Sequence, residues 1–135
     1  MTKDNHYIIA VDFDQTLIKG NHWPDVEGEP NGYLIQHLKI LKEEDGTKLI
    51  LNTCRTGEAL QAAVDWCKAQ GLEFDAVNEN LPELIEAYGQ DTRKISADIY
   101  IDDCACHPDS YNWSFANAYG LKLTNHWLYT KEIKA

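Results

Sequence analysis

Acidic side chains and one hydroxyl group lie at the ends of three apolar segments of the sequence. They are Asp12, Asp14, Thr53, Asp102 and Asp103. Two like charges about 4 Å apart repel by roughly 4 kcal/mol at an effective dielectric of about 20, so acids gathered from several segments need a cation among them. Carboxylate oxygens are hard ligands, and Mg²⁺ combines such ligands with water and phosphate oxygens. The pattern predicts a Mg²⁺ site for a phosphorylated substrate.

The spacing of Asp12 and Asp14 suits two different tasks at one reacting group. In an extended strand, residues i and i+2 face the same side, so both carboxylates can approach the same phosphorus atom. One acid can attack as a nucleophile while the other donates and accepts a proton. Charge stabilisation then requires cations and hydrogen-bond donors opposite the acids. The candidates are Thr53, Arg55, and either Arg93 or Lys94.

The apolar pattern predicts the elements that position these residues. Short apolar runs predict buried strands over residues 7–13, 48–53 and 97–102, with a shorter one over 72–77. Helical spacing predicts helices over 34–41, 58–70 and 81–89, the last with Asn80 as its N-cap. Residues 19–32 are expected to form a loop, and residues 110–135 a helix and an edge strand. Strands that alternate with helices predict an α/β, Rossmann-like fold, whose mainly parallel sheet is covered on both faces and binds ligands at its carboxyl edge.

Length, charge and cysteine content limit the class of protein. The chain has 135 residues, 44% of them hydrophobic and 25% charged, which predicts a single domain over residues 1–135. A formal net charge of −10 argues against broad, non-specific binding to nucleic acid. No apolar run approaches the roughly 20 residues of a membrane span, and the start lacks the pattern of a secretion signal, so we expect a cytoplasmic protein without a membrane partner. The four cysteines are then expected to be thiols.

Four segments resemble, in the same order, the motifs of the haloacid dehalogenase superfamily of phosphatases. The segment "DFDQTL" is similar to the first motif, Asp-x-Asp-x-Thr, and "LNTCRTG" to the second, a strand that ends in Thr or Ser. Lys94 stands where the third-motif lysine is expected, and "IYIDD" resembles the acidic fourth motif. The four motifs extend over residues 7–103, and the resemblance implies the three-layer sandwich of that superfamily.

The resemblance also implies a role for each matching residue. Asp12 would form an aspartyl-phosphate, and Asp14 would protonate the leaving oxygen and then activate water. Thr53 would hydrogen-bond the phosphoryl group, while Lys94 would neutralise charge on that group and on Asp12. Mg²⁺ would be held by Asp12, the backbone carbonyl of Asp14, Asp102 and Asp103, with the direct ligand among the last two left open.

The lengths between the motifs indicate a member without a cap domain. The predicted helices and strands already take up the segments between Asp14 and Thr53 and between Thr53 and Lys94. Residues 19–32 would then be the only lid over an open site. Arg55 and Thr16 are the predicted substrate-binding residues.

Other functions are compatible with the same residues. One is a phosphatase for the phosphorylated end of a nucleic acid, as in the capless domains of polynucleotide kinase-phosphatases. Another is a phosphate-binding module without catalysis. A phosphoacceptor receiver domain is disfavoured, because its accepting aspartate would lie on a middle strand, where this sequence has Thr53.

Two further groups have a structural and a functional interpretation. Cys104, Cys106 and His107 are soft metal ligands, but three crowded ligands fall short of the four of a structural zinc site, so free thiols are favoured. Trp23 could stack on a substrate ring, although packing inside the protein is the more common role of such a residue.

Overall fold

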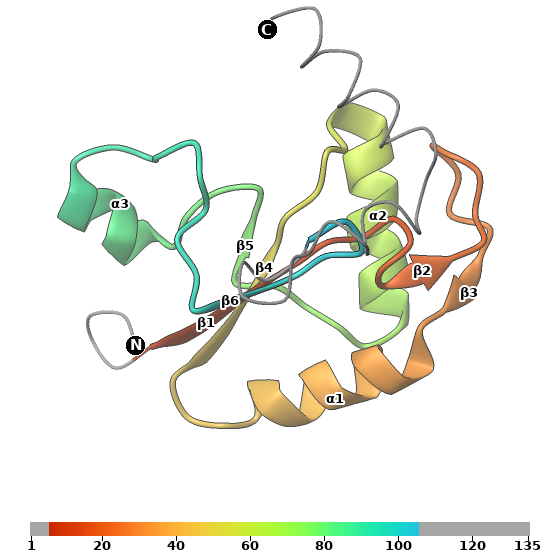
Figure 1. Cartoon of the computed structure of the whole chain (residues 1–135), viewed down its shortest axis with the longest axis horizontal. Coiled ribbons are helices and arrows are strands. Elements are labelled where there is room, and N and C mark those ends of the chain that lie inside the picture. Colours follow the sequence, from red (N-terminus) through yellow and green to blue (C-terminus); the bar gives the residue numbers. More distant parts are fainter. Residues whose placement is uncertain (1–5, 106–135) are drawn as a thin grey trace, which may run out of the picture. The chain divides into compact units, whose positions relative to one another are not determined.

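The computed structural model describes residues 6–105 of the chain (Figure 1). Residues Met1–Asp103 form one compact unit, and a second unit begins at Cys104. The single domain expected over residues 1–135, like the helix and strand expected in 110–135, therefore extends beyond the described residues and stays a prediction. No helix within residues 6–105 is both long enough and apolar enough to cross a membrane.

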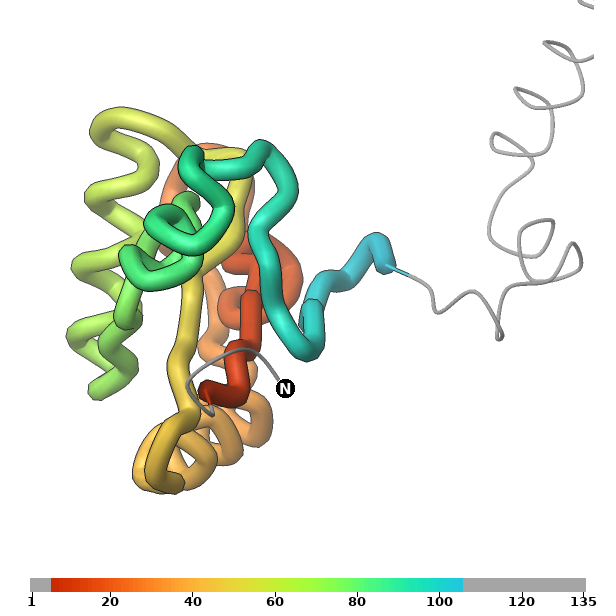
Figure 2. The backbone as a smooth tube through the Cα atoms, turned by 90° about the vertical axis from the view of Figure 1, so that its left-hand side faces the viewer, coloured from red at the N-terminus to blue at the C-terminus, as the bar shows by residue number. Residues whose placement is uncertain are grey.

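A four-stranded parallel sheet forms the centre of the described unit. Its strands are β1 (Tyr7–Val11), β4 (Thr47–Leu51), β5 (Ala76–Val77) and β6 (Ile99–Ile101), in the order β5-β4-β1-β6. Val11 pairs with Leu51 on one side and with Ile101 on the other, so the three strands end at the same level. Figure 2 shows β4, β1 and β6 side by side. The predicted parallel α/β sheet is thus confirmed.

Helices cover both faces of this sheet. They are α1 (Gly32–Lys42), α2 (Gly57–Ala69) and α3 (Pro82–Tyr88). Ile9 and Val11 of β1 face a core that includes Leu38 of α1 and Cys67 of α2. The alternate residues Ile8 and Ala10 face a second core that includes Leu84 of α3. The alternation of side chains along a strand therefore builds three layers, with α1 and α2 on one face and α3 on the other (Figure 1).

The segment predicted as a loop contains a short antiparallel hairpin. Its strands are β2 (Ile18–Lys19) and β3 (Glu29–Pro30). Gly28 lies so close to the first strand that a Cβ atom there would come within 2.4 Å of the Lys19 carbonyl oxygen. Only glycine fits at this position, which explains how the hairpin closes. Within residues 6–105, the connections between sheet strands hold this hairpin and the three helices and no further domain.

The predicted N-cap of α3 is wrong. Leu81 occupies that position, and the side chain of Asn80 is fully buried instead. Its amide donates to Asp91 Oδ1 at 2.8 Å, and its carbonyl oxygen accepts from the Ser96 backbone N–H at 2.6 Å. Asn80 therefore fastens the segment that leads into β6, because a buried amide must satisfy its hydrogen bonds within the protein.

Cys67 should be protected from alkylation in the native protein. It is buried on α2, and burial raises the pKa of its thiol to about 12, whereas Cys54 is exposed. Since the thiolate is the reacting species, iodoacetamide at about pH 8 should label Cys54 and leave Cys67 unmodified. Peptide mass spectrometry after a short pulse measures both sites. Labelling of Cys67 should appear in urea, and equal labelling of the two cysteines in the native state would contradict the packing of α2.

Candidate functional site

The acidic side chains meet at the carboxyl edge of the sheet. The backbone N–H of Asp12 donates to the carbonyl oxygen of Ile101 at 2.9 Å, and the N–H of Asn52 donates to that of Val11 at 2.8 Å. The first residues beyond β1, β4 and β6 are therefore held side by side. The strand order also reverses between β1 and β6, because the chain first adds β4 and β5 on one side of β1 and then returns to the other. Open α/β sheets bind ligands at such a reversal.

Asp12 is the partly buried carboxylate of this edge. The pKa of Asp12 is raised from 3.8 to about 6, mainly by burial and to a lesser extent by the negative charges of Asp102 and Asp103, while hydrogen bonds from Phe13 and Thr16 oppose the shift. The Thr16 hydroxyl donates to Asp12 Oδ2 at 3.3 Å and accepts from the backbone N–H of Asp103 at 3.1 Å. Thr16 thus links the ends of β1 and β6. In this structure, it positions two acids, and its predicted contact with substrate remains a prediction.

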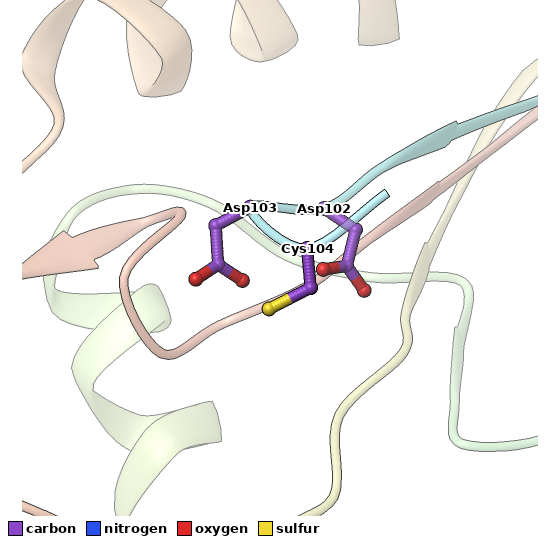
Figure 3. Close-up of side chains that lie close together, drawn as sticks. All are labelled: Asp102, Asp103 and Cys104. Atoms are coloured by element: carbon purple, nitrogen blue, oxygen red, sulfur yellow. The ribbon is translucent and has the colours of Figure 1, made fainter. Parts of the chain in front are cut away.

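Asp102 and Asp103 follow β6 directly and are exposed. One ligand atom each from Asp102, Asp103 and Cys104 lies within 4.8 Å of the others (Figure 3). Asp12 does not belong to this close group, but its pKa responds to the charges of both aspartates. The structure therefore brings three of the four predicted metal-binding acids into one electrostatic neighbourhood, in which oxygen ligands predominate.

Asp14 forms a bidentate ion pair with Arg55. Its Oδ2 accepts from Arg55 Nε at 2.9 Å and its Oδ1 from Arg55 Nη2 at 2.7 Å. Asn21 Nδ2 also donates to Oδ1, at 3.0 Å. Burial alone would raise the pKa of Asp14, but the hydrogen bonds from Arg55 and Asn21 and the charge of Arg55 outweigh it and lower the pKa. Two carboxylates separated by one residue therefore have opposite pKa shifts.

Arg55 is fully buried, and every N–H of its guanidinium group has an acceptor within the protein. Besides Asp14, the acceptors are the carbonyl oxygens of Pro24, Asp25 and Ala59. An arginine has five donors, and five hydrogen bonds use all of them. No donor remains for a phosphate group. In this structure Arg55 positions Asp14 and the loop at Pro24. Its predicted substrate-binding role stays a prediction and would require some of these hydrogen bonds to break.

Thr53 keeps a hydroxyl proton that could serve a ligand. Its Oγ1 accepts from the backbone N–H of Arg55 at 3.2 Å, and its own backbone N–H donates to Asn78 Oδ1 at 2.8 Å. The Asn78 amide donates in turn to the Arg55 carbonyl oxygen at 3.1 Å. Among the described residues, the Thr53 O–H donates to no acceptor. Asn78 thus fixes the turn after β4, on which Thr53 and Arg55 both lie.

Lys94 lies apart from the carboxylates of the first motif. Its Nζ is 5.5 Å from the centroid of the Tyr100 ring, and within residues 6–105 it forms no ion pair with Asp12 or Asp14. The side chain is exposed, so it can change its conformation at little cost. The predicted neutralising role of Lys94 therefore requires a different conformation from the one in this structure.

Sequence reasoning missed two asparagines that fix the site. Asn21 joins the Asp14 carboxylate to the carbonyl oxygen of Asp25, at 3.0 and 2.9 Å, and Asn78 fixes the turn after β4. Both stand in polar segments where asparagine is an ordinary turn residue. No local signal could have separated these hydrogen-bonding partners from ordinary turn residues.

A solved structure shows what this chain is similar to. It is that of a conserved protein from Bacteroides thetaiotaomicron, with 39% sequence identity, a TM-score of 0.64, and coverage of 82% of this chain and 86% of the other. The two chains belong to one protein family. The similarity supports the α/β fold over most of the length of this family member. No model of a known protein family matches the sequence, and no curated protein matches it significantly.

Removing the guanidinium group should destabilise the protein strongly. Arg55→Ala leaves Asp14 without its counter-charge and frees three carbonyl oxygens, and breaking a buried pair from one side costs roughly 3 kcal/mol or more in the free energy of unfolding. Urea unfolding measures this loss. Arg55→Lys keeps the charge but loses the bidentate geometry, so most of the loss in the free energy of unfolding should persist.

A double-mutant cycle with Asp14→Ala provides the control. The costs of Arg55→Ala and Asp14→Ala should be strongly non-additive, because each single change removes the same ion pair. Additive costs would show that the two side chains do not interact.

The ion pair should also make the protein sensitive to acid. The pKa of Asp14 is lowered from 3.8 in the folded state, so its contribution to stability is complete above that pH and is lost as the pH falls through the lower folded-state value. The free energy of unfolding of the native protein should therefore decrease more steeply below about pH 4 than that of Asp14→Asn. Urea unfolding between about pH 6 and pH 2 measures both slopes, and equal slopes would contradict the lowered pKa.

Proposed function

We propose that this protein is a Mg²⁺-dependent phosphatase that hydrolyses phosphate monoesters through an aspartyl-phosphate on Asp12. The observation that supports it best is the position of Asp12, which lies at the reversal point of a parallel sheet and whose pKa is raised in part by two further acids. Neighbouring negative charges destabilise a carboxylate unless a cation binds beside them. A site that binds a cation and a phosphoryl group explains why they are placed together.

The donor set fits Mg²⁺. The ligands would be Asp12, the backbone carbonyl of Asp14, Asp102 and Asp103, all of them hard oxygen donors. When bound, the ion would lower the pKa of Asp12 and reduce the negative charge that develops on the phosphoryl oxygens.

In the proposed reaction, a carboxylate oxygen of Asp12 attacks phosphorus and the bond from phosphorus to the leaving oxygen breaks. Water then attacks the phosphorus of the aspartyl-phosphate, which releases inorganic phosphate and restores the carboxylate. The Thr53 hydroxyl, which has a proton to donate, would bind a phosphoryl oxygen during both steps. Only the ionised form of Asp12 is a nucleophile, and a pKa of about 6 leaves most of this carboxyl group ionised at neutral pH. A bound cation would extend its ionisation to lower pH.

The ion pair of Asp14 bears on the second half of the proposal. Asp14 would protonate the leaving oxygen, but both of its oxygens accept from Arg55 in this structure. At least one of these hydrogen bonds would have to break during turnover. The same pair favours a second candidate function, a phosphate-binding module without catalysis, since a locked Asp14 leaves binding intact and removes the proton donor.

The negative net charge of the chain favours a phosphorylated small molecule over the end of a nucleic acid as the substrate. The chain carries a formal net charge of −10, and Arg55, the cation nearest to Asp14, has no free donor. Binding of a polyanion depends on several cations that neutralise phosphates. A phosphorylated small molecule needs only the site itself, in a protein that we expect to be cytoplasmic.

Hydrolysis of p-nitrophenyl phosphate with and without Mg²⁺ tests the proposal. The native protein should release p-nitrophenol only with the metal, and Asp12→Asn should lower the rate by at least about 10³-fold, because an amide is not a nucleophile. Asp45→Asn is the matched control. Asp45 is exposed before β4, at the opposite end of the parallel strands, and this variant should keep the native rate.

Two outcomes would overturn the proposed mechanism. Metal-dependent hydrolysis that survives in Asp12→Asn would exclude Asp12 as the nucleophile. A folded native protein that binds Mg²⁺ and inorganic phosphate, yet hydrolyses none of a panel of phosphate monoesters, would identify the phosphate-binding module instead.

A further inference from the structure

Three side chains form a stack beside the proposed site. The Arg55 guanidinium carbon lies 4.8 Å from the centroid of the Phe13 ring and 5.0 Å from that of the Trp23 ring. Phe13 and Arg55 have no exposed surface, whereas Trp23 is 59% exposed. The stack therefore begins in the core and ends with an indole ring at the surface. One face of the indole ring packs against the guanidinium group, and the exposed surface of Trp23 is on the remaining part of the side chain.

The backbone that carries the indole ring is fixed by hydrogen bonds, and the ring itself packs on the guanidinium group. The Asp25 N–H donates to the carbonyl oxygen of His22 at 2.7 Å, which closes a turn around Trp23. Arg55 donates to the carbonyl oxygens of Pro24 and Asp25, the two residues that follow. Contact with a ligand would therefore cost little additional ordering, which is what makes a rigid aromatic residue an effective binding surface.

The stack is joined directly to the site. The guanidinium group under the indole ring also binds both oxygens of Asp14, which lies two residues from Asp12. A phosphate monoester attacked by Asp12 would thus have its leaving group near a fixed, exposed aromatic ring. Tyr33 is more exposed, at 84%, but lies on α1 with His37 as its ring partner. Within residues 6–105, no hydrogen bond or ring contact links Tyr33 to the carboxylates.

We propose that the exposed face of Trp23 binds the planar ring of the substrate's leaving group, so that the preferred substrates are small phosphate monoesters that carry such a ring, as nucleoside monophosphates do. This inference rests on the proposed phosphatase function and specifies its substrate class. Stacking on indole suits a neutral planar ring, and it requires none of the additional cations that a polyanionic substrate would need.

The test compares adenosine 5′-monophosphate with ribose 5-phosphate. Both release phosphate from the same primary oxygen, so they differ in the ring and not in the bond that breaks. With Mg²⁺, the native protein should have the higher kcat/KM for the nucleotide. Trp23→Ala should lower that value at least about fivefold, and by a clearly larger factor than the value for ribose 5-phosphate, since aromatic stacking on a base contributes about 1–3 kcal/mol.

Further variants separate stacking from folding. Trp23→Phe should retain most of the preference, whereas Trp23→Leu, which keeps apolar bulk above Arg55, should lose it. Tyr33→Ala is the control for loss of an exposed aromatic side chain and should behave as the native protein. A preference that persists in both Trp23→Leu and Trp23→Ala would overturn the proposal.

A binding experiment tests the ring site without any need for turnover. Calorimetry with Asp12→Asn and Mg²⁺ should show tighter binding of adenosine 5′-monophosphate than of ribose 5-phosphate, and the difference should disappear when Trp23→Ala is added. If no phosphatase activity is found but this difference is present, the proposed hydrolysis fails and the ring site stands. If the two ligands bind equally, the ring site fails.

Sedimentation of Trp23→Ala completes the test. A loss of self-association without a change in ligand preference would identify the indole face as an interface between copies of the chain and would overturn the proposal.

Discussion

The guanidinium group of Arg55 is a full positive charge without exposed surface, and the arrangement of the site depends on how that charge is accommodated. A buried charge is tolerated only when it is paired and when its donors are satisfied. Asp14 supplies the pairing, and three carbonyl oxygens complete the set. These acceptors come from the end of β1, the loop before β3 and the first turn of α2. One side chain therefore connects the parts of the protein that surround the carboxyl edge.

A second constraint arises from the parallel sheet itself. Because β1 and β6 end at the same level, the acids that follow them are brought together without any long-range attraction between them. Burial is the main cause of the raised pKa of Asp12, and repulsion by Asp102 and Asp103 adds to it. Thr16 offsets part of that repulsion by donating to Asp12 and accepting from the Asp103 backbone. A bound cation would therefore stabilise the ionised form of Asp12. Asp14, two residues later, is already paired with the positive charge of Arg55.

The pKa values of the two carboxylates of the first motif thus shift in opposite directions because of their surroundings and partners, and not because of their spacing. Strand alternation predicted both on one side, but Asp12 and Asp14 lie beyond the end of β1, and Arg55 and Asn21 bind only Asp14. The same guanidinium group supports the Trp23 ring from beneath. These contacts oppose opening of the loop that was expected to act as a lid, since a loop held by buried hydrogen bonds opens only if they break. The hairpin and Gly28 hold the rest of that loop against β2.

The sequence by itself determined the parallel α/β sheet, its helices on both faces and the position of the acids at its carboxyl edge, because these follow from local apolar patterns and from the direction of parallel strands. The tertiary structure alone decided the partners. Arg55 and Asp14 are 41 positions apart, and nothing in the local sequence distinguishes a buried arginine with five acceptors from an exposed one that binds phosphate. The same holds for Asn80, which resembled an N-cap, and for Trp23, whose exposure depends on what lies beneath it. Local patterns record whether a residue is apolar, whereas hydrogen-bond partners and exposure depend on which distant segments the fold brings into contact.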